Sequence, residues 1–195
     1  MRLDAEFWEQ RYRSSQTGWD IGTSSTPLKG YIESLQDKSL NILIPGCGNA
    51  YEAECLIGSG FENITLLDIA PSAVSNMNMR FKGTTVRILL EDFFNHEGAY
   101  DLILEQTFFC ALDPSLRKNY VRKMAQLLKP TGKLVGVLFN RHFDGGPPFG
   151  GHVTEYQNLF APELEIKKME LCYNSIPPRK DAEVFFIAEP SAIPH

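Results

Sequence analysis

The sequence has few cysteines and no long apolar run. Its four cysteines form no CxxC pair, and three of them lie in apolar surroundings, so we expect reduced thiols rather than a disulfide framework. No stretch approaches the roughly 18 apolar residues that a membrane span needs. The opening residues, MRLDAEFWEQRYR, lack the apolar core of a signal peptide. These absences predict a cytoplasmic protein with no membrane partner.

An excess of basic charge is also missing. The net charge is −5, whereas a nucleic-acid binder usually carries a basic face, so we expect no nucleic-acid partner. The length of 195 residues, with 43% hydrophobic and 22% charged residues, suits one globular domain that acts as a monomer. We predict a single domain over 1–195, in which an N-terminal cover segment, 1–39, precedes a core, 40–195.

Short apolar runs alternate with amphipathic runs from residue 40 onward. This alternation predicts a parallel sheet covered by helices on both faces. The expected strands are 41–45, 63–69, 84–90, 100–105 and 131–139, and the expected helices are 50–60, 71–81 and 113–130. Two further strands, 164–172 and 182–189, follow without a helical pattern and favour an antiparallel pair that closes one edge. The first 39 residues resemble a helix, a loop and a second helix laid over the sheet.

A glycine loop follows the first expected strand, in LIPGCGNAYEAE. Gly46 and Gly48 lie between that strand and the next helix, where a parallel sheet binds its ligands and glycine lets the backbone approach them closely. A dinucleotide site requires a third glycine, and Tyr51 stands at that position. The loop therefore disfavours an NAD-dependent oxidoreductase.

Acidic residues end the second and third expected strands. Asp68, 22 residues after Gly46, can accept both hydroxyl groups of a ribose. Glu91 and Asp92 are followed by Phe93, a combination suited to the amino group and the ring of adenine. The loop and these acids together suit S-adenosylmethionine.

Several motifs in a fixed order resemble one family over nearly the whole chain. They include FWEQRY, GWDIGTSSTP, IPGCGN, LLDI, LLEDFF, YDLILEQTFFCALDPSLR, LLKPTGKL, GGPPF and IPPRK. The chain resembles the thiopurine S-methyltransferase superfamily, and within it the thiol, thiocyanate and halide methyltransferases. The resemblance implies an α/β class I methyltransferase with a Rossmann-like fold, a seven-stranded, mostly parallel sheet and an N-terminal helical cover.

The resemblance also implies cofactor-binding positions for S-adenosylmethionine, whose product is S-adenosylhomocysteine. They are Trp8, Tyr12, Trp19, Gly46, Cys47, Gly48, Asp68, Ile69, Asp92, Phe93 and Gln106. The three aromatic side chains can hold a sulfonium by cation–π attraction, although Trp8 and Tyr12 also fit the apolar face of an amphipathic helix. Gln106 replaces the tyrosine of plant relatives and the arginine of mammalian ones, which affects the expected substrate rather than the cofactor.

Methyl transfer to a soft nucleophile needs alignment and a dry pocket more than a strong base. We expect a substrate pocket formed by Gln106, Phe109, Arg141, Pro148, Phe149 and Arg179, with no assigned catalytic base and no metal. Arg179 is the first anion-binding candidate and Arg141 the second, although each is also explained as a solvated charge. The stretch NRHFDGGPPFGGH (140–152) suggests a lid over the methyl group, and a merely flexible connection is the alternative.

The predicted function is transfer of a methyl group to a small thiol, bisulfide, thiocyanate, halide or other chalcogen nucleophile. The same residues also allow two alternative functions. One is a thiopurine-type aromatic thiol methyltransferase, and the other is a non-catalytic protein that binds S-adenosylmethionine.

Overall fold

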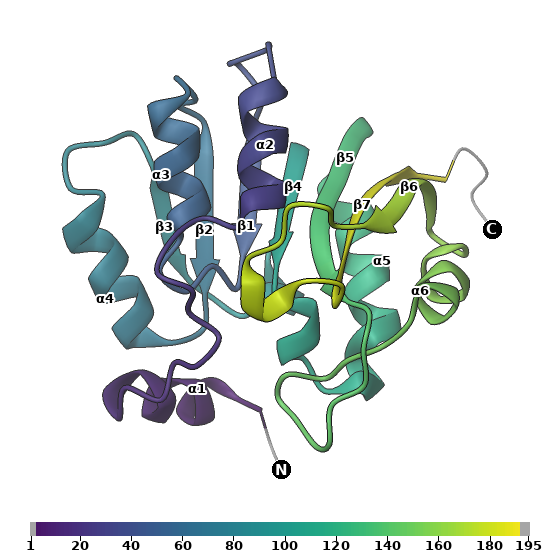
Figure 1. Ribbon diagram of the computed structural model, residues 1–195. Coiled ribbons are helices and arrows are strands. Elements are labelled where there is room, and N and C mark those ends of the chain that lie inside the picture. Colours follow the sequence, from purple (N-terminus) through teal and green to yellow (C-terminus); the bar gives the residue numbers. More distant parts are fainter. Residues whose placement is uncertain (1–2, 192–195) are drawn as a thin grey trace.

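The computed structural model describes residues 3–191, so the ends of the predicted domain, 1–2 and 192–195, lie outside the described residues. Seven strands form one sheet in the order β3-β2-β1-β4-β5-β7-β6 (Figure 1). In chain order they are β1 (Ile42–Pro45), β2 (Ile64–Asp68), β3 (Arg87–Leu90), β4 (Tyr100–Gln106), β5 (Leu128–Phe139), β6 (Leu164–Leu171) and β7 (Glu183–Pro190).

The first five strands are parallel, and the last two are antiparallel. β1 pairs with β2 and β4, β2 with β3, and β4 with β5, all in parallel. β7 runs antiparallel between β5 and β6. The predicted fold class, a seven-stranded, mostly parallel Rossmann-like sheet with an antiparallel pair at one edge, is therefore confirmed.

Helices cover both faces of the sheet because its central strands are apolar on both sides. They are α1 (Ala5–Arg13), α2 (Thr26–Ser34), α3 (Tyr51–Gly58), α4 (Pro71–Arg80), α5 (Arg117–Leu127) and α6 (Val153–Phe160). Every residue of β1 and β2 is buried. Alternate strand residues pack into two separate cores, one with α2, α3 and α4 and the other with α5 and α6. Four short 3₁₀ helices complete the fold: η1 (Phe93–Asn95), η2 (Phe109–Ala111), η3 (Pro114–Leu116) and η4 (Pro177–Arg179).

The largest differences from the predicted boundaries concern the helix over 113–130 and the third strand. The helix expected over 113–130 is η3 followed by α5, and β5 already begins at Leu128. Pro130 explains the early end, because a proline disfavours helical conformation in the residue before it. The third strand begins at Arg87 instead of residue 84. The sequence prediction also missed α6, which has only eight residues and follows a stretch rich in glycine and proline.

The N-terminal helices occupy two different places. α2 buries Pro27, Leu28 and Ile32 and belongs to the core on the α3 side of the sheet. α1 instead lies across the edge at which the parallel strands end, and the loop after β5 reaches the same edge (Figure 1). The predicted helix–loop–helix is thus present, and its first helix borders the ligand-binding edge. Within residues 3–191, no helix is long and apolar enough to cross a membrane.

Candidate active site

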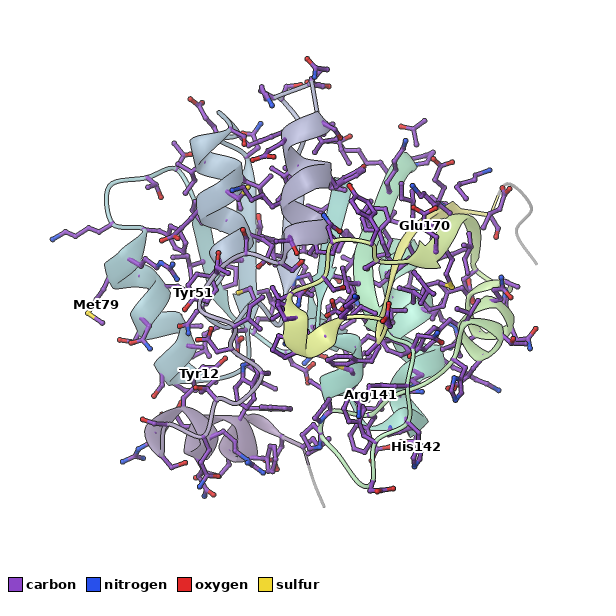
Figure 2. All side chains as sticks on the ribbon, viewed as in Figure 1. Tyr12, Tyr51, Met79, Arg141, His142 and Glu170 are labelled. Atoms are coloured by element: carbon purple, nitrogen blue, oxygen red, sulfur yellow. The ribbon has the colours of Figure 1, made fainter. Side chains whose placement is uncertain are left out.

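A cavity of about 1160 Å³ opens where the parallel strands end. Its walls come from α1 and the segment after it, from the loops after β1 to β5, and from η4. Most of the predicted site residues line it: Trp8, Tyr12, Trp19, Gly46, Asp68, Ile69, Asp92, Phe93, Arg141, Pro148 and Arg179. In Figure 2, Tyr12 and Arg141 approach this edge from α1 and from the loop after β5.

The glycine loop after β1 brings its backbone to the cavity in a left-handed conformation. Gly46 and Gly48 both have φ of +54°. A methyl group added to Gly46 would lie 2.1 Å from the ring of Phe108, so no side chain fits there. Cys47 does not line the cavity, and its Sγ atom donates to the Leu67 carbonyl at 3.4 Å. Burial raises the pKa of the Cys47 thiol well above its usual value, which leaves it unreactive.

The two predicted carboxylates end β2 and follow β3. The Oδ2 atom of Asp68 accepts the Gly48 N–H at 2.9 Å, and its Oδ1 atom accepts the Ala70 N–H at 2.9 Å. Burial raises the pKa of Asp68, although these two hydrogen bonds act in the opposite direction. Asp92 accepts the Phe94 N–H at 2.9 Å and so begins η1. The strand ends therefore hold both carboxylates firmly at the cavity wall.

Three aromatic side chains form the cover side of the cavity. Trp19 makes edge contacts with Trp8 and Tyr12, with ring centroids 5.5 and 5.7 Å apart. Glu9 holds α1, the helix that carries Trp8 and Tyr12. Its carboxylate accepts the Ser72 N–H at 2.8 Å and the Ser72 hydroxyl at 2.7 Å, at the start of α4. Burial raises the pKa of Tyr12, so its phenol stays neutral.

Of the two arginines predicted at the cavity, Arg179 has an acidic partner, and Arg141 has none within residues 3–191. Arg179 donates to Glu183 at 3.2 Å and to the Trp19 carbonyl at 3.0 Å, and so ties η4 to the cover. Arg141 is exposed, its guanidinium lies 4.8 Å from the centre of the Phe143 ring, and it has no ion pair within residues 3–191.

Three predicted substrate residues lie behind the cavity surface. Phe109 is fully buried in the core between Tyr120 and Tyr156, because the turn into η2 points Phe108 rather than Phe109 at the cavity. Phe149 does not line the cavity, since its ring packs against Gly146. Gln106 is also absent from the lining, and its Oε1 atom is buried with no hydrogen-bond partner in the described chain. Gly48 and Cys47 likewise stand behind the wall.

The sequence analysis missed two buried charged residues next to the site. Glu105, at the end of β4, is fully buried and accepts hydrogen bonds from the Tyr120 hydroxyl at 2.6 Å and the Phe109 N–H at 3.0 Å. The sequence pattern that could have revealed Glu105 is an acidic residue at the end of an apolar run. Arg117, at the start of α5, carried no such signal, because an arginine in an amphipathic helix is usually solvated. Among residues 3–191, no group of three or more His, Cys, Asp or Glu side chains could hold a metal ion.

This sheet order, with a glycine loop after β1, an acid at the end of β2 and an acid after β3, is a Rossmann-like arrangement. Solved structures of class I S-adenosylmethionine-dependent methyltransferases share this fold. A family model described as Thiopurine S-methyltransferase (TPMT) matches residues 3–190. The chain therefore belongs to the thiopurine S-methyltransferase family and is a methyltransferase.

Named relatives agree with this assignment. "Probable thiol methyltransferase 2" of Arabidopsis thaliana is 32% identical over 185 residues, which cover 90% of this chain and 81% of the relative. "Thiocyanate methyltransferase 1" of the same plant is 30% identical over 186 residues, with 90% and 81% covered. The solved structure of a Burkholderia thailandensis 1,6-didemethyltoxoflavin-N1-methyltransferase, with S-adenosylhomocysteine bound, matches 96% of this chain and 87% of its own with a TM-score of 0.76. At 15% identity, that likeness shows the fold alone.

Proposed function

We propose that this protein transfers the methyl group of S-adenosylmethionine to a small sulfur nucleophile that arrives as an anion. The observation that carries this proposal is that the cavity offers no available base. Among residues 3–191, no histidine lines the cavity. Of its carboxylates, Asp68 and Asp92 would be occupied by the cofactor, and Asp4, Glu91 and Asp113 already take part in hydrogen bonds within the chain. A thiolate, bisulfide or thiocyanate needs no proton removed by the protein, whereas an alcohol or an amide would.

The residues at the cavity fit the cofactor. Gly46, which has no side chain, lines the cavity together with the carboxylates of Asp68 and Asp92. Asp68 would hold the ribose hydroxyl groups, and Asp92 with Phe93 would hold the adenine. Trp8, Tyr12 and Trp19 would face the sulfonium. When bound, S-adenosylmethionine supplies an electrophilic methyl group, and the chain's own work is to align the nucleophile with it and to exclude water.

The acceptor side combines apolar walls with an exposed arginine, Arg141. Phe139, Phe143, Pro147 and Pro148 line this part of the cavity. Because Arg179 is already paired with Glu183, Arg141 is the better candidate to attract an anionic nucleophile. Apolar walls favour an organic thiolate over a bare halide, because the carbon atoms of the thiolate can pack against them and a halide has none. The same aromatic and proline walls support a second candidate, an aromatic thiol of the thiopurine type.

The test is headspace gas chromatography after incubation with S-adenosylmethionine and one acceptor per vial: thiophenol, bisulfide, thiocyanate, iodide or selenite. We expect methylated thiols to dominate. For thiophenol, kcat/KM should rise with pH only until the thiol itself ionises, and for thiocyanate, already an anion, it should stay flat. Arg141→Gln should raise the KM for both, and Arg122→Gln, a matched change at an exposed arginine of α5, should not. Silence in every vial, with S-adenosylhomocysteine still bound, would overturn the proposal in favour of a binding protein.

A further inference from the structure

Arg117 is a buried arginine whose guanidinium contacts three different segments. Only 7% of its side chain is exposed. One terminal nitrogen donates to Glu155 of α6 at 2.6 Å. The other donates to the carbonyls of Phe149 at 3.2 Å and Gly150 at 2.8 Å. The guanidinium also lies 4.7 Å from the centre of the Phe109 ring. The Nε–H is buried without a hydrogen-bond partner among residues 3–191, so three hydrogen bonds and the Phe109 ring hold this buried charge.

The two carbonyls belong to the loop that forms one wall of the cavity. Arg141 and Gly151 pair across the base of this loop, with the Gly151 N–H donating to the Arg141 carbonyl at 3.1 Å. Pro147 and Pro148, just before Phe149, line the cavity. Within residues 3–191, Arg117 is the only side chain that bonds the backbone of 142–151.

The same loop is joined to η2, a neighbouring part of the cavity wall. The Phe149 N–H donates to the Cys110 carbonyl at 2.7 Å, and Cys110 lines the cavity from η2. Arg117 packs on Phe109, the neighbour of Cys110. It therefore lies behind both the proline wall and the η2 wall, without itself lining the cavity.

We propose that Arg117 is a positioning residue that fixes the Pro147–Phe149 wall against η2 and thereby sets the shape of the acceptor side. Its effect on turnover rests on the proposed function. The role requires an arginine, because a planar fork can bond a carboxylate and two carbonyls at once and a lysine ammonium cannot do so in the same geometry. If 140–152 moves as a lid, its movement is confined to the part before Phe149, because the end of the loop is held by Arg117.

The first test measures the loop itself. NMR amide exchange at Phe149 is compared among the wild type, Arg117→Lys and Arg122→Lys. Arg122 lies on the same helix, is 60% exposed and forms an ion pair with Glu163 at 3.5 Å, so the same chemical change there should leave the loop untouched. We expect exchange at Phe149 to rise at least tenfold in Arg117→Lys and not in Arg122→Lys. Unchanged exchange at Phe149 in folded Arg117→Lys overturns the proposal.

The second test separates positioning from a merely structural role. In Arg117→Lys, the KM for thiophenol should rise about tenfold, while the affinity for S-adenosylhomocysteine stays within twofold. An equal loss of both would mean general damage to the fold and would count against the proposal. If Arg117→Lys does not fold, Glu155→Gln decides, because it removes the charge that orients the guanidinium and should raise exchange at Phe149 as well. A wild type that methylates no acceptor defeats the proposed function, yet the exchange measurement still decides the role of Arg117.

Discussion

Gly46 illustrates how one missing side chain shapes the glycine loop after β1. Its φ of +54° is unfavourable for any residue with a Cβ atom, and an added methyl group would meet Phe108 at 2.1 Å. Phe108 cannot simply move away, because its ring packs on Phe93 and Tyr120 with centroids 5.1 and 6.0 Å apart. The residue is therefore constrained by backbone conformation and by packing at the same time.

We expect Gly46→Ala to destabilise the protein by more than the 1–2 kcal/mol or so that left-handed backbone alone costs an alanine. Gly60→Ala is the matched control, since Gly60 has φ of +86° and nothing within 4 Å of an added methyl group. Urea unfolding of both variants measures the difference. Adding Phe108→Ala should recover part of the extra loss in a double-mutant cycle. Equal losses for Gly46→Ala and Gly60→Ala would show that the clash with Phe108 relaxes freely.

Glu105 joins three elements behind the cavity wall. It lies one residue before the end of β4, and it accepts hydrogen bonds from the Phe109 N–H of η2 and the Tyr120 hydroxyl of α5. Burial raises its pKa to about 7, although both hydrogen bonds act against that rise. Since the folded protein keeps this proton at pH values where the unfolded chain has lost it, this carboxyl reduces stability as pH rises from about 4.5 to about 7.

Replacing Glu105 by glutamine should remove that pH dependence. At pH 8 we expect Glu105→Gln to be more stable than the wild type by roughly 2–3 kcal/mol, and at pH 4.5 to be nearly equal, because the neutral amide avoids the burial of a charge. Urea unfolding at both pH values measures this, with Glu62→Gln, a change at an exposed glutamate, as the control. A stability difference that does not change with pH would mean that Glu105 titrates alike in the folded and unfolded states.

The carboxylate of Glu9 joins α1 to the start of α4. Glu9 binds both the N–H and the hydroxyl of Ser72, and these bonds lower the pKa of Glu9. We expect Glu9→Ala to speed protease cleavage within 3–25 several-fold, whereas Glu6→Ala, which loses only an exposed contact with Gln10, should not. S-adenosylhomocysteine should slow cleavage of the wild type if the cover orders on cofactor binding. Identical cleavage rates with and without this ligand would contradict that expectation.

The general fold could be predicted from the sequence because alternating apolar and amphipathic runs leave few other arrangements. The position of β7 between β5 and β6 could not, since two similar strands at the end of a chain do not reveal their order. At the site, Asp68 and Asp92 could be predicted from the sequence, because the carboxyl ends of parallel strands meet at one edge of the sheet. Phe108 and Phe109 are adjacent and chemically identical, and only the turn into η2 decides which one reaches the cavity. The hydrogen-bond partners of Arg117 lie more than 30 residues away, so no local pattern reveals them.

Because the cavity is built from both ends of the chain, ligand binding should stabilise the whole molecule. Trp8 and Tyr12 come from α1 and Arg179 from η4, while Asp68 comes from the middle of the sheet. At a concentration of S-adenosylhomocysteine 100 times its Kd, about 2.7 kcal/mol of stabilisation is expected, which corresponds to a rise in Tm of roughly 5–10 °C for a chain of this size. NAD should cause no rise. Asp68→Asn should abolish most of the shift, and Asp101→Asn, a half-buried carboxylate at the far end of β4 that binds Lys129, should keep it. A full shift in Asp68→Asn would mean that the ribose is held elsewhere.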